Sequence, residues 1–185
     1  MKQLFQKITQ LKVLELFIKN PREEYYLREA ARILKMDPAT VHRSLNLLLK
    51  EGLIKRERRK NLILYRANME NLSFRYIKIA YNLQWFKKKK LVETLKMELP
   101  GLSSVILYGS YANGENDEDS NIELLTISHT RKNLAPQIKK LLKKEVFHLN
   151  LSLAQWIKIE RENRELYLDI ITNGIVLYGK KPIAG

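Results

Sequence analysis

Residues 105–127, VILYGSYANGENDEDSNIELLTI, decide the fold of the second half of the chain. Two apolar runs, 105–108 and 122–127, flank a polar loop, which predicts two buried strands joined by that loop. The loop begins with Gly109 and Ser110. Glycine lets the backbone turn sharply and approach a ligand, and a serine hydroxyl can cap a helix or bind a phosphate. The stretch therefore predicts a strand, a phosphate-type turn, an acidic loop and a second strand.

Ten residues separate Ser110 from Asn121, and Glu123 follows on the same face of the predicted second strand. This spacing resembles the signature of the polymerase-beta-type nucleotidyltransferase superfamily, in particular its minimal members, which read Gly-Ser, ten residues, Asp-x-Asp. The resemblance implies that these two positions and a third carboxylate hold two divalent cations, which align a hydroxyl with the α-phosphate of a nucleotide. A neutral amide cannot offset a cation's charge, and Glu carries its carboxylate further out than Asp. We therefore expect the nucleotidyltransferase fold with a degenerate site and no bound metal.

The rest of this half is predicted to contain a helix over 133–144, a strand over 146–153 and a last strand over 174–178. Alternation along 146–153 predicts one set of side chains facing the core and another facing away. The core set is Phe147, Leu149, Leu151 and Leu153, and the other is Val146, His148, Asn150 and Ser152. By the resemblance, the third carboxylate comes from this strand, and Asn150, or less favourably His148, is predicted at its position.

The first half of the chain reads as helices followed by a hairpin. A helix is predicted over Leu4 to Ile18, an extended piece over 24–27 and a helix over 28–35. Asp37 is a good N-cap and Pro38 suits the first helical position, so a further helix begins at about residue 39. A hairpin with a basic tip follows Gly52. This order resembles the winged helix-turn-helix of prokaryotic and archaeal transcription regulators over residues 8–70.

The resemblance implies that the second helix of the motif enters the major groove and that the wing follows the backbone or minor groove. Candidate DNA contacts on the helix are Thr40, His42, Arg43 and Asn46, and those on the wing are Arg58, Arg59 and Lys60. Arg43 and Asn46 can pair with base edges, His42 can reach a base or a phosphate, and the wing side chains are predicted phosphate contacts. The alternative is a protein-binding module with a solvated hairpin.

Charge is unevenly distributed, although the total is +14. Residues 1–100 contain 23 Lys and Arg against 10 Asp and Glu, whereas residues 101–185 contain 11 against 10. The first half is therefore predicted to bind a polyanion, and the winged-helix resemblance implies that this partner is double-stranded DNA.

Residues 72–99 contain no Gly or Pro, which predicts a long connecting helix, with a break near Asn82. Its apolar side chains exceed what a connector needs, which predicts a homodimer interface; the alternative is that they pack on the chain's own domains. These side chains are Phe74, Ile77, Tyr81, Trp85 and Leu91. The expected fold class is α+β, with a winged helix-turn-helix over 1–70, a connecting helix over 71–100 and a nucleotidyltransferase-like domain with a mixed sheet over 101–185.

Composition excludes several classes. The absence of Cys rules out disulfides and zinc fingers, and three His without paired spacing do not support a histidine metal site. No apolar run reaches the roughly 20 residues of a membrane span, and the first residues lack a signal-peptide core, so a cytoplasmic protein is expected. Many Lys and Glu without Cys suit a thermophile. The acidic loop 115–119 is interpreted as a solvated turn, with a shifted cation site as the alternative.

Two functions follow. The first is a DNA-binding transcription regulator whose nucleotidyltransferase-like domain, without metal or cofactor, serves for dimerisation, for binding a nucleotide effector or for docking a protein partner. The alternative is an active or weakly active nucleotidyltransferase that uses Mg²⁺ and a nucleotide to modify a protein, nucleic acid or small molecule, as minimal members of the antitoxin type modify a paired toxin.

Overall fold

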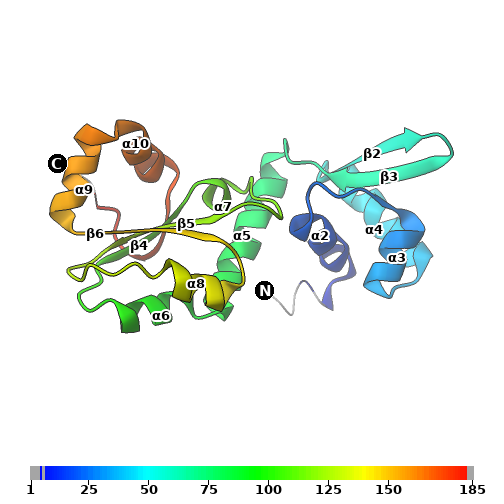
Figure 1. Cartoon of the computed structure of the whole chain (residues 1–185). Coiled ribbons are helices and arrows are strands. Elements are labelled where there is room, and N and C mark those ends of the chain that lie inside the picture. Colours follow the sequence, from blue (N-terminus) through cyan, green and yellow to red (C-terminus); the bar gives the residue numbers. More distant parts are fainter. Residues whose placement is uncertain (1–4, 6, 183–185) are drawn as a thin grey trace. The chain divides into compact units, whose positions relative to one another are not determined.

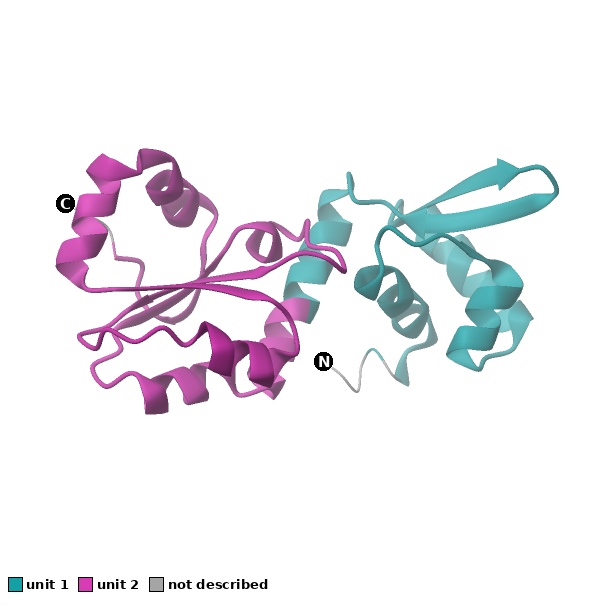
Figure 2. Cartoon of the chain, in the orientation of Figure 1, with its two compact units in different colours: residues 1–81 teal, residues 82–185 magenta. Residues whose placement is uncertain are grey.

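The chain folds into two compact units, residues 1–81 and 82–185 (Figure 2). The computed structural model describes Phe5 and residues 7–182. The units divide inside one helix, α5 (Leu72–Lys88), so residues 71–100 do not form a separate body. In the part of the chain that the structure describes, no helix has the length and apolar character needed to cross a bilayer.

The N-terminal unit is a helix-turn-helix with a wing (Figure 1). Its elements are α2 (Thr9–Lys19), β1 (Tyr25–Tyr26), α3 (Leu27–Leu34), α4 (Pro38–Lys50), β2 (Ile54–Arg59), β3 (Leu62–Ala67) and the first part of α5. The three strands form an antiparallel sheet in the order β1-β3-β2. The predicted start of α4 is confirmed, because the Asp37 side chain accepts a 3.0 Å hydrogen bond from the Thr40 backbone N–H.

One prediction for this unit needs correction. The helix predicted from Leu4 to Ile18 is interrupted by a bend at Ile8, and α2 begins only at Thr9. Leu4 lies outside the described residues. Ile8 has extended backbone (φ −95°, ψ 115°), so the run of apolar residues continues across a break in the helix.

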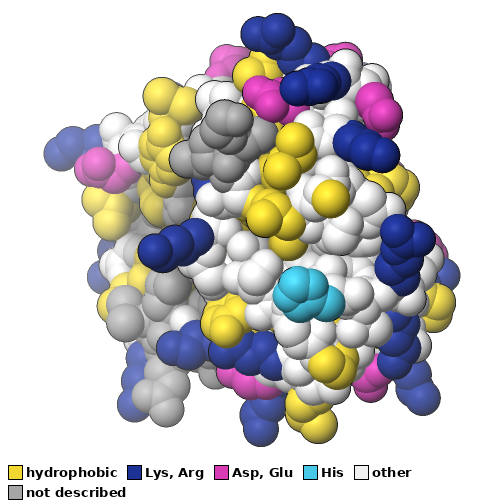
Figure 3. Space-filling model, turned by 90° about the vertical axis from the view of Figure 1, so that its left-hand side faces the viewer, with side chains coloured by type: hydrophobic (Ala, Val, Ile, Leu, Met, Phe, Trp, Pro, Cys, Tyr) yellow, Lys and Arg dark blue, Asp and Glu magenta, His cyan; other side chains and the backbone are white. Residues whose placement is uncertain are grey.

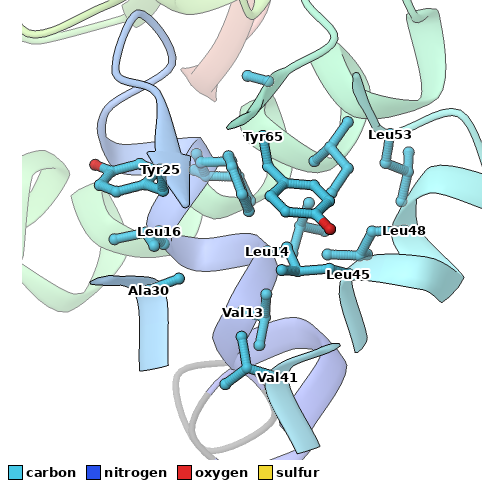
Figure 4. Close-up of a cluster of buried hydrophobic side chains, with 14 of the residues drawn as sticks. Val13, Leu14, Leu16, Tyr25, Ala30, Val41, Leu45, Leu48, Leu53 and Tyr65 are labelled. Atoms are coloured by element: carbon cyan, nitrogen blue, oxygen red, sulfur yellow. The ribbon is translucent and has the colours of Figure 1, made fainter. Parts of the chain in front are cut away.

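One hydrophobic core holds the N-terminal unit together (Figure 4). Side chains from α2, α3, α4 and the sheet meet in it, among them Leu14, Ala30, Leu45 and Tyr65. Phe74 from the first part of α5 is fully buried in the same core. Burying apolar area at about 25 cal/mol per Å² is the main stabilising contribution to such a domain.

The C-terminal unit is a four-stranded mixed sheet with helices on both faces (Figure 1). Its elements after α5 are α6 (Leu91–Glu98), β4 (Ser104–Tyr108), α7 (Ser110–Asn113), β5 (Ile122–Ile127), α8 (Ala135–Leu142), β6 (Val146–Leu151), α9 (Leu153–Glu162), α10 (Arg164–Asn173) and β7 (Ile175–Gly179). The order is β6-β5-β4-β7, with β5 parallel to β6 and β4 antiparallel to both β5 and β7. This confirms the α+β class.

Each face of the sheet has its own core. Leu91, Leu95 and Ile138, from α6 and α8, pack on one face, which we call the α6/α8 face. Trp156 and Ile170, from α9 and α10, pack on the other, the α9/α10 face. Because both faces are covered, the alternate side chains of a strand can be buried on either side.

The break in the connecting helix lies at Lys89 and Lys90, so the prediction of a break near Asn82 is wrong. Lys90 adopts a left-handed conformation (φ 55°) and its N–H bonds to the Lys87 carbonyl, which ends α5. Asn82 stays helical, and its side-chain amide donates to Asn116.

The apolar side chains that motivated a dimer interface pack inside the two units instead. Phe74, with the partly buried Ile77 and Tyr81, belongs to the N-terminal core, and Leu91, with the partly buried Trp85, belongs to the C-terminal core. The five side chains named for the interface therefore pack on the chain's own units, whereas Leu72, Tyr76 and Met97 of the same segment are exposed.

Candidate functional site

The exposed face of α4 carries the predicted base-reading side chains. Val41, Leu45 and Leu48 are buried, which turns His42, Arg43 and Asn46 to solvent and leaves Thr40 half-buried. Two contacts order this face: Arg43 Nη2 donates to Thr40 Oγ1 and Asn46 Nδ2 donates to His42 Nε2, each at 3.4 Å. All four predicted residues therefore share one helix face.

The wing has two chemically different faces, because residues directly opposite in an antiparallel pair point to the same side. Ile54 pairs with Ala67 and Arg56 with Tyr65, and the buried members of these pairs place this side over the core. Towards the tip, Arg58 and its partner Ile63 continue the same side, which we call the inner face of the wing. Lys55, Glu57, Arg59, Leu62, Leu64 and Arg66 form the outer face.

Arg58 and Arg59, although adjacent, therefore differ in what they contact. Arg59 forms two parallel hydrogen bonds to Glu24, at 2.7 and 2.8 Å, and a third from Nε to Glu57 at 2.8 Å. The hydrogen bond to Arg59 lowers the pKa of Glu57, and together the two carboxylates offset the guanidinium charge. Arg58 is exposed, and its Nε makes only a long contact of 3.4 Å to the Lys60 carbonyl. The predicted set Arg58, Arg59 and Lys60 is thus not one surface.

Arg56 is a candidate contact that the sequence analysis missed. It is exposed and shares the inner face with Arg58 two residues later. Alternation within the hairpin was the available signal, because residues i and i+2 of a strand lie on one side. Lys60 sits in the turn with a left-handed backbone (φ 53°).

Figure 3 shows one face of the molecule, on which several Lys and Arg side chains gather at the lower left and along the right-hand edge, with hydrophobic side chains between them.

The C-terminal candidate site is a cavity of about 380 Å³ lined by Ser110, Ser120, Asn121, Glu123 and Phe147. The turn at Gly109 (φ 65°) brings Ser110 to it. A Cβ on Gly109 would lie 1.6 Å from Glu123 Oε2, so only glycine allows the carboxylate to pack against this turn. The carboxylate accepts a hydrogen bond from the Ser110 backbone N–H.

Electrostatically, the Glu123 carboxylate is unfavourably placed. Burial, and then the negative charge of Asp169 on α10, raise its pKa, while the Ser110 N–H opposes this shift. Asp169 was not among the predicted residues. It comes from a helix far along the chain, so no local pattern could have identified it.

Asn150 does not belong to this site, which corrects the predicted third position. Parallel pairing sets Glu123 opposite Phe147 and Thr126 opposite Asn150, so Asn150 lies on the α6/α8 face and Glu123 on the α9/α10 face. The Asn150 amide donates to the carbonyls of Thr130 and Lys132, and its carbonyl accepts from Thr126 and Ser128. It fastens a loop beside the sheet.

The predicted facing of the strand is also wrong at Phe147, and the predicted strand is too long, because Leu153 is the first residue of α9. Phe147 and Leu153 are 52% and 56% exposed, whereas His148 is only 8% exposed. β6 is an edge strand of a sheet covered on both faces, so alternation alone does not tell which set is buried.

His148 is a buried neutral side chain and not a metal ligand. Its Nδ1 accepts from the Leu134 N–H at 3.1 Å, and its Nε2 lies 2.9 Å from Thr126 Oγ1. Burial lowers its pKa to about 4. No cluster of three or more His, Asp or Glu side chains suited to a metal ion occurs among the described residues.

The acidic loop is stabilised from within. Asp117 accepts from the Asp119 N–H at 3.0 Å and from the Ser120 hydroxyl at 2.8 Å, as in a polar turn. Glu118, Asp119 and Ser120 also line a second cavity, of about 610 Å³, together with Lys139, Lys140, Lys143, Lys144 and Glu145.

Comparisons with known proteins agree with both halves of the fold. Residues 11–58 match the family model of the IclR helix-turn-helix domain. Residues 89–183 match the model described as polymerase beta, nucleotidyltransferase. No match was found among curated proteins.

Several solved structures are distantly similar. A crystal structure of a toxin-antitoxin with AMP-PNP has 20% sequence identity to this chain. The match covers 50% of this chain and 73% of that chain, with a TM-score of 0.39. A possible transcriptional regulator from Methanosarcina mazei Go1 has 22% sequence identity. The match covers 49% of this chain and 77% of that chain, with a TM-score of 0.35. The archaeal chromatin protein TrmBL2 has 17% sequence identity. The match covers 85% of this chain and 69% of that chain, with a TM-score of 0.30. Similarity this slight carries no conclusion about function.

The family models decide the assignment. The helix-turn-helix model covers the region of α2 to β2, and the nucleotidyltransferase model covers α6 to β7. Since the nucleotidyltransferase model matches more than half of the residues of this chain, the chain belongs to the polymerase beta nucleotidyltransferase family.

Proposed function

We propose that the protein is a DNA-binding transcription regulator whose nucleotidyltransferase domain has lost two-metal chemistry and serves to bind an effector or a partner. The observation that carries the DNA-binding part is the grouping of Arg56 and Arg58 on the inner face of the wing, in a unit whose α4 presents Arg43 and Asn46. The family membership and the pocket around Glu123 carry the second part.

DNA binding by this unit needs two kinds of contact. Arg43 and Asn46 can form paired hydrogen bonds with base edges, while arginines on a wing bind phosphates and position the helix without reading sequence. The excess of basic residues in the first half supplies the sequence-independent part of the affinity.

The proposed loss of two-metal chemistry rests on the small number of carboxylates that could bind metal ions in the pocket. Two-metal catalysis requires each divalent ion to be largely neutralised by carboxylates. Glu123 is the one carboxylate that lines the pocket, because Asn121 and Phe147, the latter opposite Glu123 in the strand register, carry none. The residues present do not fit two ions.

Arg58 and Arg59 offer a matched test of the DNA-binding part. Removing a phosphate contact should weaken binding to all duplexes and lower the slope of log K against log salt by about 0.9. We expect Arg58→Ala and Arg56→Ala to do this. Arg59→Ala, which removes the same charge from the outer face, should leave the slope unchanged. Equal slopes for Arg58→Ala and wild type would refute the assignment of the inner face.

Sequence reading is tested separately on α4. Arg43→Ala should cost about 1–3 kcal/mol at a selected binding site and much less on random-sequence DNA. An equal loss of affinity for the selected site and for random-sequence DNA would instead mean that Arg43 contacts the phosphate backbone of the DNA.

A second candidate function, nucleotide transfer, is favoured by the family membership and by the retained Glu123. Incubation with Mg²⁺, radiolabelled nucleotides and protein or nucleic-acid acceptors tests it. If the wild-type protein labelled an acceptor in a metal-dependent way and Glu123→Ala abolished the labelling, the protein would be an active nucleotidyltransferase and the proposed loss of two-metal chemistry would be wrong.

A homodimer remains part of the proposal on one ground only. Helix-turn-helix regulators generally read paired half-sites, and one small domain makes few base contacts. Sedimentation with and without duplex DNA tests it, and a monomer bound to a single half-site would remove it.

A further inference from the structure

The cavity of the C-terminal unit pairs an aromatic ring with a carboxylate. Phe147 stands directly beside Glu123 in the parallel β5–β6 register, and both line the same cavity of about 380 Å³. That volume is in the range of small-molecule sites. Phe147 lies on the edge strand of the sheet and is 52% exposed, so its ring is accessible to a ligand.

Negative charge at this place is not balanced by the protein. Burial, and then the negative charge of Asp169, raise the pKa of the Glu123 carboxyl. The contacts of Glu123 and Asp169 within the described residues are the Ser110 N–H and the Asn173 amide, both neutral. No Lys or Arg in the described part of the chain forms an ion pair with either carboxylate.

A buried hydroxyl beside these carboxylates also lacks a partner. Tyr108 lies opposite Glu123 in the β4–β5 register and is only 2% exposed. Its hydroxyl forms no hydrogen bond with any described residue. Burial, and then the charges of Glu123 and Asp169, raise the pKa of this hydroxyl. Unsatisfied buried polar groups are rare in native proteins and mark places where a ligand or ion completes the hydrogen bonding.

The donor set distinguishes between kinds of cation. A divalent metal requires several charged oxygens, and this cavity has one carboxylate at its surface. An ammonium or guanidinium group on an alkyl stem instead gains from the face of an aromatic ring and from a carboxylate at its edge. Ser110, Ser120 and Asn121 add neutral oxygens that accept hydrogen bonds from N–H groups.

We propose that this cavity binds an organic cation, an alkylammonium or guanidinium group, paired with Glu123 and resting on the Phe147 ring, with the negative charge of Asp169 behind Glu123 adding to the attraction. The inference builds on the proposed loss of two-metal chemistry, because it gives the pocket another ligand class. A free polyamine and a basic side chain of a protein partner share this chemistry.

Calorimetric titration of the full-length, DNA-free protein with spermidine, Nα-acetylarginine amide and, separately, MgCl₂ tests the site. The formal charge of +14 disfavours adventitious binding of cations, so saturable binding reports a specific site. We expect one site for an organic probe, weakened roughly fivefold or more by Phe147→Leu and more strongly by Glu123→Gln or Asp169→Asn. Phe147→Tyr keeps a ring and should retain binding.

Glu145→Gln is the matched control, because Glu145 is an acidic residue of the other cavity, paired with Lys139. It should leave binding unchanged. Absence of saturable binding of either organic probe, or binding that Phe147→Leu leaves unaltered, would overturn the proposal. Stoichiometric binding of Mg²⁺ alone would overturn it too, and would also count against the lost metal chemistry, whereas failure of the organic probes without Mg²⁺ binding leaves the proposed function standing. The spermidine and arginine arms tell a polyamine from a protein side chain.

Discussion

Mild acid should destabilise the C-terminal unit through one residue, His148. The imidazole is 8% exposed and neutral, accepts from the Leu134 N–H and contacts Thr126 Oγ1, which in turn donates to Asn150. A proton on Nδ1 would face the Leu134 N–H and remove this hydrogen bond. The folded state therefore resists protonation.

The size of the effect follows from the two pKa values. The pKa of His148 is about 4 in the folded protein against 6.5 when unperturbed. The unfolded chain takes up a proton as the pH falls below 6.5, and the folded protein does so only near 4, so stability is lost within that window. At a pH of about 5 the free energy of unfolding should be about 2 kcal/mol lower than at about 8, and the loss levels off at about 3 kcal/mol in stronger acid.

Urea unfolding followed by tryptophan fluorescence measures this quantity for the correct unit, because both tryptophans, Trp85 and Trp156, belong to residues 82–185. His148→Gln provides the control. It does not titrate in this range, so its stability should change with pH by about 2 kcal/mol less than that of wild type. The raised pKa of Glu123 acts in the opposite direction in both proteins and cancels in the comparison. If the variant and wild type lost the same free energy between these pH values, the assignment to His148 would be wrong.

Further changes test the wing, the pocket and the turn. Glu24→Gln raises the net charge, yet we expect it to weaken DNA binding several-fold, because it releases Arg59 and loosens the wing; tighter binding in a titration at fixed salt would mean that Arg59 itself contacts phosphate. Asn121→Asp with Phe147→Asp places three carboxylates on the α9/α10 face, and calorimetry should then detect Mg²⁺ binding that Asn121→Asp with Asn150→Asp does not produce. Gly109→Ala should lower stability by about 1–3 kcal/mol in urea, since the backbone at this turn is strained for any other residue and the Cβ meets the Glu123 carboxylate.

Local patterns predicted the elements that local forces determine. Asp37 and Pro38 specify the start of α4 whatever surrounds it, and the apolar period along α4 is set by one core. The spacing from Ser110 to Glu123 likewise lies within a single turn and two paired strands. These features were predicted correctly.

Features that depend on distant partners could not be read from the sequence. The outer face of the wing depends on Glu24, and the charge on Glu123 depends on Asp169, each contributed by another element. The prediction of which β6 side chains are buried failed because apolar helices cover both faces of the sheet. Phe147 is therefore exposed and His148 buried, the reverse of the prediction. A left-handed lysine, Lys90, ends α5 without any residue that usually signals a helix end.

The division of the chain inside α5 has a consequence for how the two halves can be exchanged between proteins. A fragment that stops at residue 70 would lose Phe74 and the buried Lys78, which donates to the Ile18 carbonyl at the end of α2. A fragment that begins at residue 101 would lose Phe86, Leu91 and Leu95 from the opposite core. Recombination at either point would leave one half with an open interior. The helix-turn-helix half and the nucleotidyltransferase half each need their own portion of this helix, and a joint between Tyr81 and Asn82 keeps both cores complete.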